Sequence, residues 1–245
     1  HTLKYSAFCG EALPELLVNK WQFAAPKSKI DNLYGPTETT LAISGYRWVK
    51  KKSSQECLNG IVPIGKLFKN NNYLKYKKKK FELILRGKQV FEGYLNSRII
   101  NKKKFIKIKN LKYFKTGDLV KINKFNNFLF LGRLDRQIKV RGFRIEPQEI
   151  ENKIKKILRS RDVVVMGWPP VGNSKHSYEN IVVFLKSIKN MHKIKILKKL
   201  KKNLSFNQIP EKIMILKKFK YNINKKVDYN YLTNILKNEN PKRKN

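Results

Sequence analysis

Cysteine, histidine and long apolar runs are all scarce in this sequence. The chain of 245 residues has only Cys9 and Cys57, three histidines and no Cys-x-x-Cys pair, so we expect neither a disulfide framework nor a metal site built from these residues. No run approaches the roughly 20 apolar residues that a membrane-spanning helix needs. The first residues lack the basic-then-apolar pattern of a signal peptide. These absences predict a cytoplasmic protein without a membrane partner.

Acidic residues are also scarce. Lys and Arg number 56 against 17 Asp and Glu, which gives a formal net charge of +39. Such a charge attracts polyanions through counterion release. Much of the excess lies in filler-like runs such as Lys77–Lys80 and Asn101–Lys104, which favours biased composition and solvated loops over a designed nucleic-acid surface. We expect no specific nucleic-acid partner, and a basic nucleic-acid-binding protein stays open as an alternative.

Enough apolar material is present to form a core, because 41% of the residues are hydrophobic and 11% are aromatic. Residues 1–45 mix short apolar runs with Gly-Glu and Gly-Pro turns, which is typical of strand ends and loops in an α/β layer. Residues 46–132 contain short alternating runs that predict a small β-barrel or sheet. The strands expected there are Phe81–Leu85, Phe105–Ile108, Leu119–Ile122 and Phe128–Leu131.

The third part of the chain, residues 133–245, predicts a compact α+β module. Pro147 is tolerated as a first helical residue, and the apolar residues after it recur at the spacing of one helical face. The order helix, strand, strand, helix, strand indicates the α+β class. The expected elements are a helix carrying Ile150, Ile154, Ile157 and Leu158, strands Asp162–Trp168 and Asn180–Lys186, a basic helix carrying Ile194, Leu197, Leu200 and Leu204, and a strand Lys212–Leu216.

Four segments combine glycine with polar and charged residues in patterns that suit a ligand site. Asn32–Thr40 places a ring, hydroxyls and a carboxylate around a Gly-Pro turn. Tyr113–Leu119 places a carboxylate after a flexible glycine, where it can accept hydrogen bonds from a sugar diol. The others are Gly132–Glu146, with dense alternating charge, and Asn222–Asp228. Taken alone, the first two are weak signals, and a capped turn explains the first at least as well.

In this order the four segments resemble the signature motifs of the adenylate-forming (AMP-binding) superfamily. The likeness is greatest to amino-acid adenylation domains of nonribosomal peptide synthetases and to D-alanine–carrier-protein ligases, and Phe8–Leu13, Ile61–Gly65 and Gly87–Tyr94 add family-like blocks at the expected intervals. The resemblance implies the end of a large N-terminal α/β domain (residues 1–45), a small β-barrel subdomain (46–132) and a mobile α+β C-terminal lid domain (133–245). The family's phosphate loop belongs upstream of Phe8. We therefore expect the C-terminal half of an enzyme, inactive by itself.

The resemblance also implies roles for particular residues in nucleotide binding. Tyr34 is similar to the adenine-stacking aromatic, Glu38 to the magnesium-binding carboxylate and Asp118 to the ribose acceptor. The other nucleotide contacts implied are Asn32 at the base edge, Gly35 in the turn, Thr37 at the α-phosphate, and Arg133 beside the ribose and phosphate. The structural alternatives are a locally packed turn aromatic for Tyr34, a helix N-terminal charge for Glu38, and surface salt bridges for Asp118 and Arg133.

Three further roles follow from the same resemblance. Lys226 matches the catalytic lysine, although the usual preceding Gly is replaced by Lys225, so the turn loses its permissive residue. Asp135 matches the hinge about which the C-terminal domain pivots. The residues expected to line the substrate pocket are Cys9, Leu33, Leu41 and Ala42.

The activity implied is ATP-dependent adenylation of an amino-acid carboxylate, which gives an acyl-AMP and pyrophosphate, followed by transfer to a phosphopantetheine thiol. ATP and magnesium are the expected cofactors, and an amino acid and an acyl or peptidyl carrier protein are the expected partners. An acyl-CoA ligase is the alternative among enzymes. An inactive fragment of this fold is a further alternative, which Lys225 weakly favours.

Overall fold

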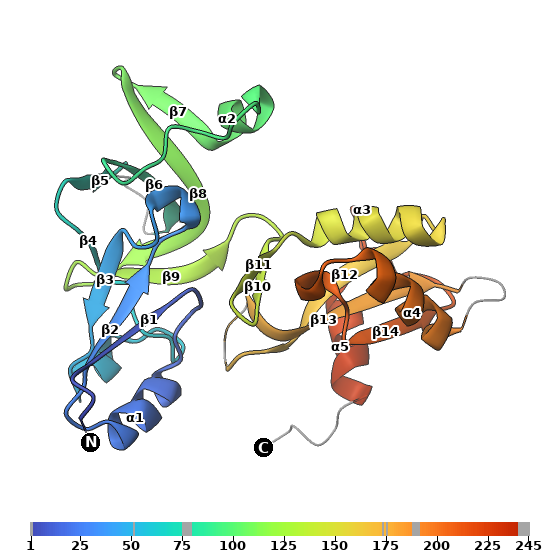
Figure 1. The fold of residues 1–245 in the computed structure, drawn as a ribbon, viewed down its shortest axis with the longest axis horizontal. Coiled ribbons are helices and arrows are strands. Elements are labelled where there is room, and N and C mark those ends of the chain that lie inside the picture. Colours follow the sequence, from blue (N-terminus) through green and yellow to red (C-terminus); the bar gives the residue numbers. More distant parts are fainter. Residues whose placement is uncertain are drawn as a thin grey trace. The chain divides into compact units, whose positions relative to one another are not determined.

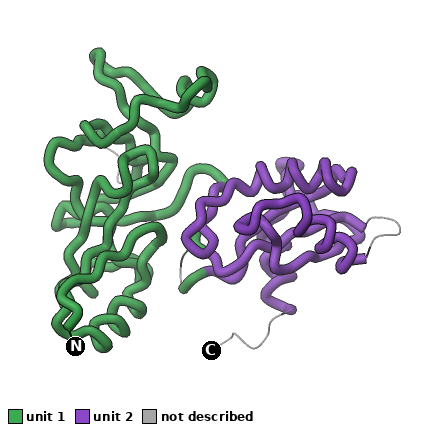
Figure 2. Tube along the Cα trace, in the orientation of Figure 1, with its two compact units in different colours: residues 1–136, 171–177 green, residues 137–170, 178–245 purple. Residues whose placement is uncertain are grey.

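The computed structural model describes residues 2–50, 52–74, 80–172, 174, 176–187 and 192–239. Of the basic run Lys77–Lys80, only Lys80 lies within the described residues. The chain forms two compact units (Figure 2). Unit 1 contains residues 1–136 and 171–177, and unit 2 contains residues 137–170 and 178–245. The fold is mixed α/β, as the sequence predicts, and its strands form three sheets.

The first sheet of unit 1 has four strands in the order β1-β2-β3-β4. Its strands are β1 (Tyr5–Cys9), β2 (Lys29–Tyr34), β3 (Ser44–Arg47) and β4 (Lys66–Leu67), and α1 (Glu15–Ala24) connects the first two. β1 and β2 run parallel, and the other neighbours are antiparallel. Val18 of α1 is fully buried against Ile30, Trp48 and Val62. Because β3 spans residues 44–47, the subdomain boundary expected after residue 45 falls inside a strand of this sheet.

The second sheet of unit 1 has five antiparallel strands built around the 12-residue strand β8. Its strands are β5 (Asn71–Tyr73), β6 (Phe81–Gly87), β7 (Phe105–Ile108), β8 (Leu111–Ile122) and β9 (Phe128–Arg133), with α2 (Arg98–Lys104) before β7 (Figure 1). β7 pairs with the first part of β8 and β9 with its last part, while β6 lies along the other edge. All four strands expected in this region are confirmed, and β8 extends further toward its N-terminus.

Unit 2 contains the third sheet, with helices on both of its faces. Its strands are β10 (Ile138–Val140), β11 (Phe143–Ile145), β12 (Val163–Pro170), β13 (Ser177–Lys186) and β14 (Lys212–Leu216), and its helices are α3 (Pro147–Leu158), α4 (Lys193–Asn203) and α5 (Tyr229–Glu239). Alternate residues of β12 face opposite sides: Val163 and Val165 pack with α3 and α4, whereas Val164 packs with α5. This alternation follows from the two-residue period of a strand.

The expected helices and strands of residues 133–245 are all present. Pro147 is the first residue of α3, and Ile150 and Ile154 are fully buried. In α4 the buried residues are Ile196 and Leu200, whereas Ile194, one of the apolar residues named for this helix from the sequence, is 82% exposed. The spacing of four between Ile196 and Leu200 sets the face that packs. Within the part of the chain that the structure describes, no helix has the length and apolarity to cross a membrane.

Candidate functional site

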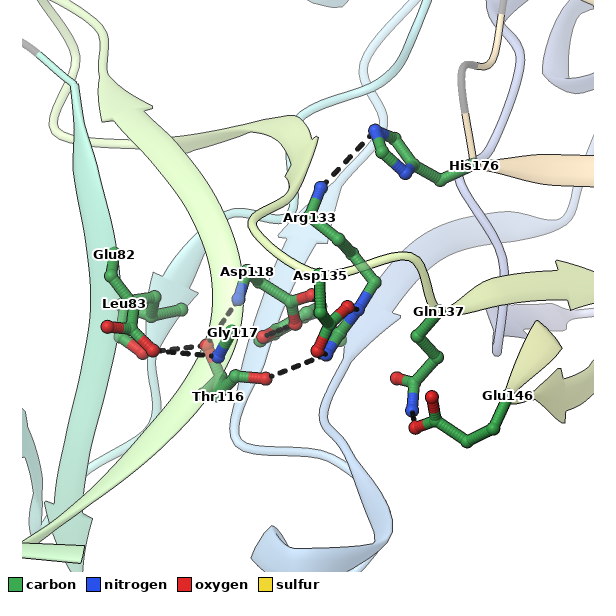
Figure 3. Close-up of polar contacts among 11 residues, drawn as sticks. Glu82, Leu83, Thr116, Gly117, Asp118, Arg133, Asp135, Gln137, Glu146 and His176 are labelled. Atoms are coloured by element: carbon green, nitrogen blue, oxygen red, sulfur yellow. Dashed lines mark hydrogen bonds and ion pairs between the residues drawn. The ribbon is translucent and has the colours of Figure 1, made fainter. Parts of the chain in front are cut away.

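Tyr34, Asp118 and Arg133 meet where β2, β8 and β9 come together in unit 1. The Tyr34 hydroxyl donates a hydrogen bond to Asp118 Oδ2 at 2.5 Å. Arg133 Nη1 donates to Asp118 Oδ1 at 2.5 Å, and the two residues face each other directly in the β8–β9 ladder (Figure 3). Both side chains of this ion pair are 8% exposed. The structure therefore joins three of the residues that the sequence assigned to nucleotide binding.

Burial and charge shift the proton affinities of this group. Burial, together with the neighbouring Asp118 carboxylate, raises the pKa of the Tyr34 hydroxyl well above its ordinary value. Burial lowers the pKa of the Arg133 guanidinium. The carboxylates of Asp135 and Asp118 together have a larger effect, so the pKa is raised overall. Tyr34 is thus a neutral donor and Arg133 a permanent cation across the physiological pH range.

Three hydrogen bonds fix the backbone of β8 around Asp118. The Thr116 hydroxyl donates to Leu83 O at 2.7 Å and accepts from the Asp118 amide at 2.9 Å, and the Gly117 amide donates to Glu82 Oε1 at 3.0 Å (Figure 3). Gly117 has φ +77°, in the left-handed region. A Cβ at this position would lie 2.7 Å from Arg133 Nη2. Glycine is therefore required here both by conformation and by the approach of Arg133.

Asp135 holds the other side of the Arg133 guanidinium. Its two carboxylate oxygens accept from Nε and Nη2 of Arg133, both at 2.7 Å. Arg133 Nη2 also donates to Thr116 O at 3.2 Å, and the Arg133 amide donates to His176 Nε2 at 3.2 Å (Figure 3). The sequence analysis assigned Asp135 only to the hinge, so it missed this bidentate ion pair of the side chain.

Glu38 lies in a short 3-10 turn, Thr37–Thr39, directly after β2, and is only 7% exposed. Its Oε1 accepts a hydrogen bond of 2.6 Å from the Tyr94 hydroxyl, and its backbone carbonyl accepts one of 2.9 Å from the Phe91 amide. Thr37 is exposed, and within the described residues no hydrogen bond of its side chain is found. The segment 87–94 thus supports the turn that carries Glu38.

Gly35 is required because the chain returns close to it. A Cβ there would lie 2.7 Å from Leu41 O and from Ala42 Cα. Real Cβ atoms do not approach backbone atoms so closely, and the backbone cannot move aside as the end of a side chain can. The Gly-Pro turn is therefore a steric requirement of the loop between β2 and β3.

Asn32 has a structural role in the fold. It is 3% exposed, and its amide nitrogen donates to Pro63 O at 2.9 Å and to Val62 O at 3.4 Å. These bonds hold β2 against the segment that leads into β4. The amide hydrogens of Asn32 are thus engaged with the protein backbone.

Three of the four residues expected in a substrate pocket lie near one another. Cys9 and Leu33 are partners across the β1–β2 ladder, and the Cys9 thiol is 3.9 Å from Leu41 O. Leu41 is 74% exposed, in the loop after Glu38. The Ala42 carbonyl accepts a hydrogen bond of 2.8 Å from the Gln89 side chain. This edge of the first sheet is partly exposed and apolar.

Lys226 belongs to unit 2 and is exposed. It closes a turn in which the Asn222 amide donates to Lys226 O at 2.8 Å and the Lys226 amide donates to Asn222 Oδ1 at 3.1 Å. The preceding residue, Lys225, has φ +56°. The backbone of this turn therefore takes the left-handed conformation that glycine adopts most readily.

No cluster of three or more Asp, Glu, His or Cys side chains able to hold a metal ion is found among the described residues. The acidic side chain for which the family resemblance implies a metal-binding role is Glu38, whose Oε1 accepts the hydrogen bond from Tyr94. One carboxylate suits Mg²⁺ that is held mainly by substrate phosphates and water, since this ion is usually bound through one or two carboxylates. The donor set thus fits a magnesium ion that binds together with a nucleotide.

No family model matches the chain, but known proteins of one kind are similar to it. The chain is 33% identical over 228 residues to the D-alanine–D-alanyl carrier protein ligase of Lactococcus lactis, covering 90% of this chain and 44% of the relative. It is 32% identical over 243 residues to the ligase of the same name from Bacillus cereus, covering 92% of this chain and 46% of the relative. The chain therefore spans less than half the length of these relatives.

Solved structures of adenylation domains match the fold. The Vibrio cholerae adenylation domain AlmE, in complex with glycyl-adenosine-5'-phosphate, has a TM-score of 0.82 and 26% identity, covering 96% of this chain and 45% of that one. Holo-PA1221, a protein containing adenylation and PCP domains, has a TM-score of 0.77 at 19% identity, covering 95% of this chain and 40% of that one, and this likeness concerns the fold alone.

Proposed function

Because this chain belongs to the adenylation domains of the AMP-binding superfamily, related to D-alanine–carrier-protein ligases, we propose that the complete protein that carries it activates an amino-acid carboxylate with ATP. The products of this step are an acyl-AMP and pyrophosphate, and the acyl group then passes to a phosphopantetheine thiol of a carrier protein. The observation that supports this most directly is the buried contact of Tyr34, Asp118 and Arg133. The cytoplasm, where ATP is supplied, is the compartment that we propose.

Nucleotide binding is proposed to use the Tyr34 ring and the Asp118 carboxylate. The hydrogen bond from the Tyr34 hydroxyl to Asp118 fixes the edge of the ring, which leaves its face for stacking on adenine. Asp118 is an acceptor that can receive ribose hydroxyls, and Arg133 balances its charge in a buried setting. Asn32 supports the proposed nucleotide site by holding β2, which carries Tyr34, to Pro63.

Phosphate binding is proposed to involve Thr37 and Glu38. The Thr37 hydroxyl is exposed and can donate to an α-phosphate oxygen, and Gly35 fixes the turn before it. Glu38 would hold the magnesium ion, which when bound neutralises phosphate charge as pyrophosphate leaves. The contribution of the protein is mainly positioning and electrostatic stabilisation.

The lysine and hinge assignments are part of the same proposal. Lys226 supplies an ammonium that would stabilise the negative charge of the substrate carboxylate and nucleotide. Unit 2 is proposed to be the mobile C-terminal lid and the second sheet of unit 1 to be the β-barrel subdomain. The first boundary between units 1 and 2 follows Arg136, next to Asp135, and this position supports the hinge assignment of Asp135.

We propose a small or apolar amino acid as the substrate, with D-alanine as one candidate. The apolar edge formed by Cys9, Leu33 and Leu41, with Ala42 beside it, suits a short side chain. The relatives named as D-alanine–D-alanyl carrier protein ligases and the glycyl-adenylate complex of AlmE support the same class.

The experiment that tests the function is ATP–pyrophosphate exchange by the complete protein with a panel of amino acids. We expect exchange with one or a few small amino acids and loss of exchange in Lys226→Ala. Transfer to a carrier protein rather than to free coenzyme A would separate this function from that of an acyl-CoA ligase. Absence of exchange with every amino acid, together with DNA binding that falls steeply with salt, would overturn the proposal.

A further inference from the structure

Glu38 is held by a chain of contacts that reaches through Tyr94 to α2. The Tyr94 hydroxyl donates to Glu38 Oε1 at 2.6 Å across 56 residues of sequence. Because Glu38 is only 7% exposed, this bond lies in a setting that excludes most water, where hydrogen bonds are stronger than at the surface. A carboxylate has about four acceptor positions, and the bond to Tyr94 uses one of them and fixes the rotamer of Glu38.

Tyr94 is itself held firmly at its backbone. The Asn101 side chain accepts from the Tyr94 amide at 2.7 Å and donates to the Tyr94 carbonyl at 2.8 Å, so one side chain engages both backbone groups. Asn101 lies in α2 and can approach because residue 93 is glycine. A Cβ on Gly93 would lie 2.9 Å from Asn101 Oδ1. This close fit indicates that the backbone of Tyr94 has little freedom.

The Tyr94 ring is also packed against aromatic neighbours. It meets Phe91 edge to face with ring centroids 4.9 Å apart, and Phe91 in turn meets Phe114 at 5.7 Å. The Phe91 amide donates to the Glu38 carbonyl at 2.9 Å. Glu38 is thus fixed at its backbone by Phe91 and at its carboxylate by Tyr94, and these two residues support each other.

We propose that Tyr94 is a positioning residue that orients the Glu38 carboxylate toward a divalent cation, and that Asn101 is the residue that fixes Tyr94. This inference rests on the proposed function, in which Glu38 holds magnesium. The physical reason is that a partner of a metal-binding carboxylate sets its orientation and so its affinity. Tyr94 acts by orienting Glu38, and in this proposal it contacts neither the metal ion nor the substrate.

The test is a titration of the complete protein with Mn²⁺, followed by electron paramagnetic resonance, in the presence of a non-hydrolysable ATP analogue. Tyr94→Phe removes only the hydroxyl, and we expect Mn²⁺ affinity to fall about 10-fold. ATP affinity measured in EDTA should stay unchanged, whereas general structural damage would weaken both. The matched control is Tyr73→Phe, because no hydrogen bond of the Tyr73 hydroxyl is found within the described residues, and its Mn²⁺ affinity should equal that of the wild type.

The outcomes separate this inference from the proposed function. Wild-type binding of Mn²⁺ with an unchanged affinity in Tyr94→Phe overturns the role of Tyr94 alone. A wild-type protein that binds no Mn²⁺ with nucleotide overturns the metal role of Glu38 and this inference together. If Tyr94→Phe does not fold, Asn101→Ala carries the test, because the Asn101 side chain holds the Tyr94 backbone and no contact between Asn101 and Glu38 is found among the described residues. An unchanged Mn²⁺ affinity in that variant overturns the proposal.

Discussion

Asp118 and Arg133 are direct partners across the β8–β9 ladder, and their side chains form an ion pair with both partners 8% exposed. Arg133 is simultaneously bound by Asp135. The charge of the cation is therefore shared between two carboxylates, which bind different edges of the guanidinium group: Asp118 at Nη1 and Asp135 at Nε and Nη2. Removing the cation would leave the buried Asp118 carboxylate without the positive charge of Arg133, while the Tyr34 hydroxyl would still donate to it.

Arg133→Ala is expected to destabilise the protein by about 3–5 kcal/mol, because it leaves a buried carboxylate without its cation. The matched control is Lys153→Ala, which removes a salt bridge to Glu149 whose partners are 41% and 53% exposed. Such an exposed pair contributes about 0.5 kcal/mol or less. Urea denaturation measures both changes. Equal losses in the two variants would contradict the structural role of the buried pair.

Gly117→Ala is expected to destabilise the protein and to weaken nucleotide binding, since the new Cβ meets Arg133 Nη2 at 2.7 Å. Gly142 provides a close control, because its φ of +81° resembles the +77° of Gly117 while nothing lies within 4 Å of its Cβ position. The strain from a positive φ costs about 1–2 kcal/mol in each variant. Gly117→Ala should lose more stability than Gly142→Ala by thermal unfolding, and identical losses would show that the clash with Arg133 is absent.

Lys225→Gly is expected to stabilise the protein by up to about 1 kcal/mol, because the residue has φ +56° and glycine adopts this conformation without a Cβ penalty. Lys218→Gly is the control, since Lys218 is exposed and is not among the residues with positive φ. That variant should be neutral or destabilised, because glycine adds freedom to the unfolded chain. A rise in the midpoint of urea unfolding for Lys225→Gly alone is the expected result. A fall would mean that Lys225 makes a stabilising contact.

Alkaline pH is expected to destabilise unit 1 through Cys57 and Tyr46. Burial raises the pKa of Cys57 from 9.0 to about 12, with Glu15 adding to the shift. Burial also raises the pKa of Tyr46 from 10.0 to about 12. Both groups are protonated in the folded state at a pH where the unfolded chain has lost the proton, so their contribution is complete below pH 9 and is lost as the pH rises toward 12.

The measurement is the urea midpoint of the wild type, Cys57→Ala and Tyr46→Phe between pH 8 and about 11.5. Each variant removes one of the two titrating groups, so its stability should fall less steeply with pH than that of the wild type. Lysine deprotonation affects the wild type and both variants alike, so its effect on stability cancels when the pH dependence of a variant is compared with that of the wild type. Parallel curves for all three proteins would contradict the assignment of these buried groups.

Much of the fold was predictable because the periodic apolar pattern is local. β7 (Phe105–Ile108) and β14 (Lys212–Leu216) have the bounds that the sequence predicts, and α3 begins at Pro147. The helix α5 was missed although Leu232 and Leu236 stand four residues apart and are both buried. In α4, the apolar residues named from the sequence include the exposed Ile194 and omit the buried Ile196, because two nearby isoleucines offer alternative faces and only packing decides between them.

The candidate site was predictable only in part, because its contacts join residues far apart in sequence. The family-like motifs contain Tyr34, Asp118 and Arg133, and the structure brings these together. The support of Glu38 by Tyr94 depends on a contact over 56 residues, for which the local pattern gives no signal. The bidentate bond of Asp135 was missed because the expected hinge role drew attention to its backbone.

The assignment of residues 171–177 to unit 1 has a consequence for any attempt to produce the two halves separately. The chain passes between the units at 136/137, at 170/171 and again at 177/178. A shortened polypeptide ending at Arg136 would lack His176, and the Arg133 amide would lose the imidazole nitrogen that accepts its hydrogen. A single proteolytic cut after the second sheet therefore does not liberate an intact unit, and recombining the two pieces by complementation would be needed to restore that hydrogen bond.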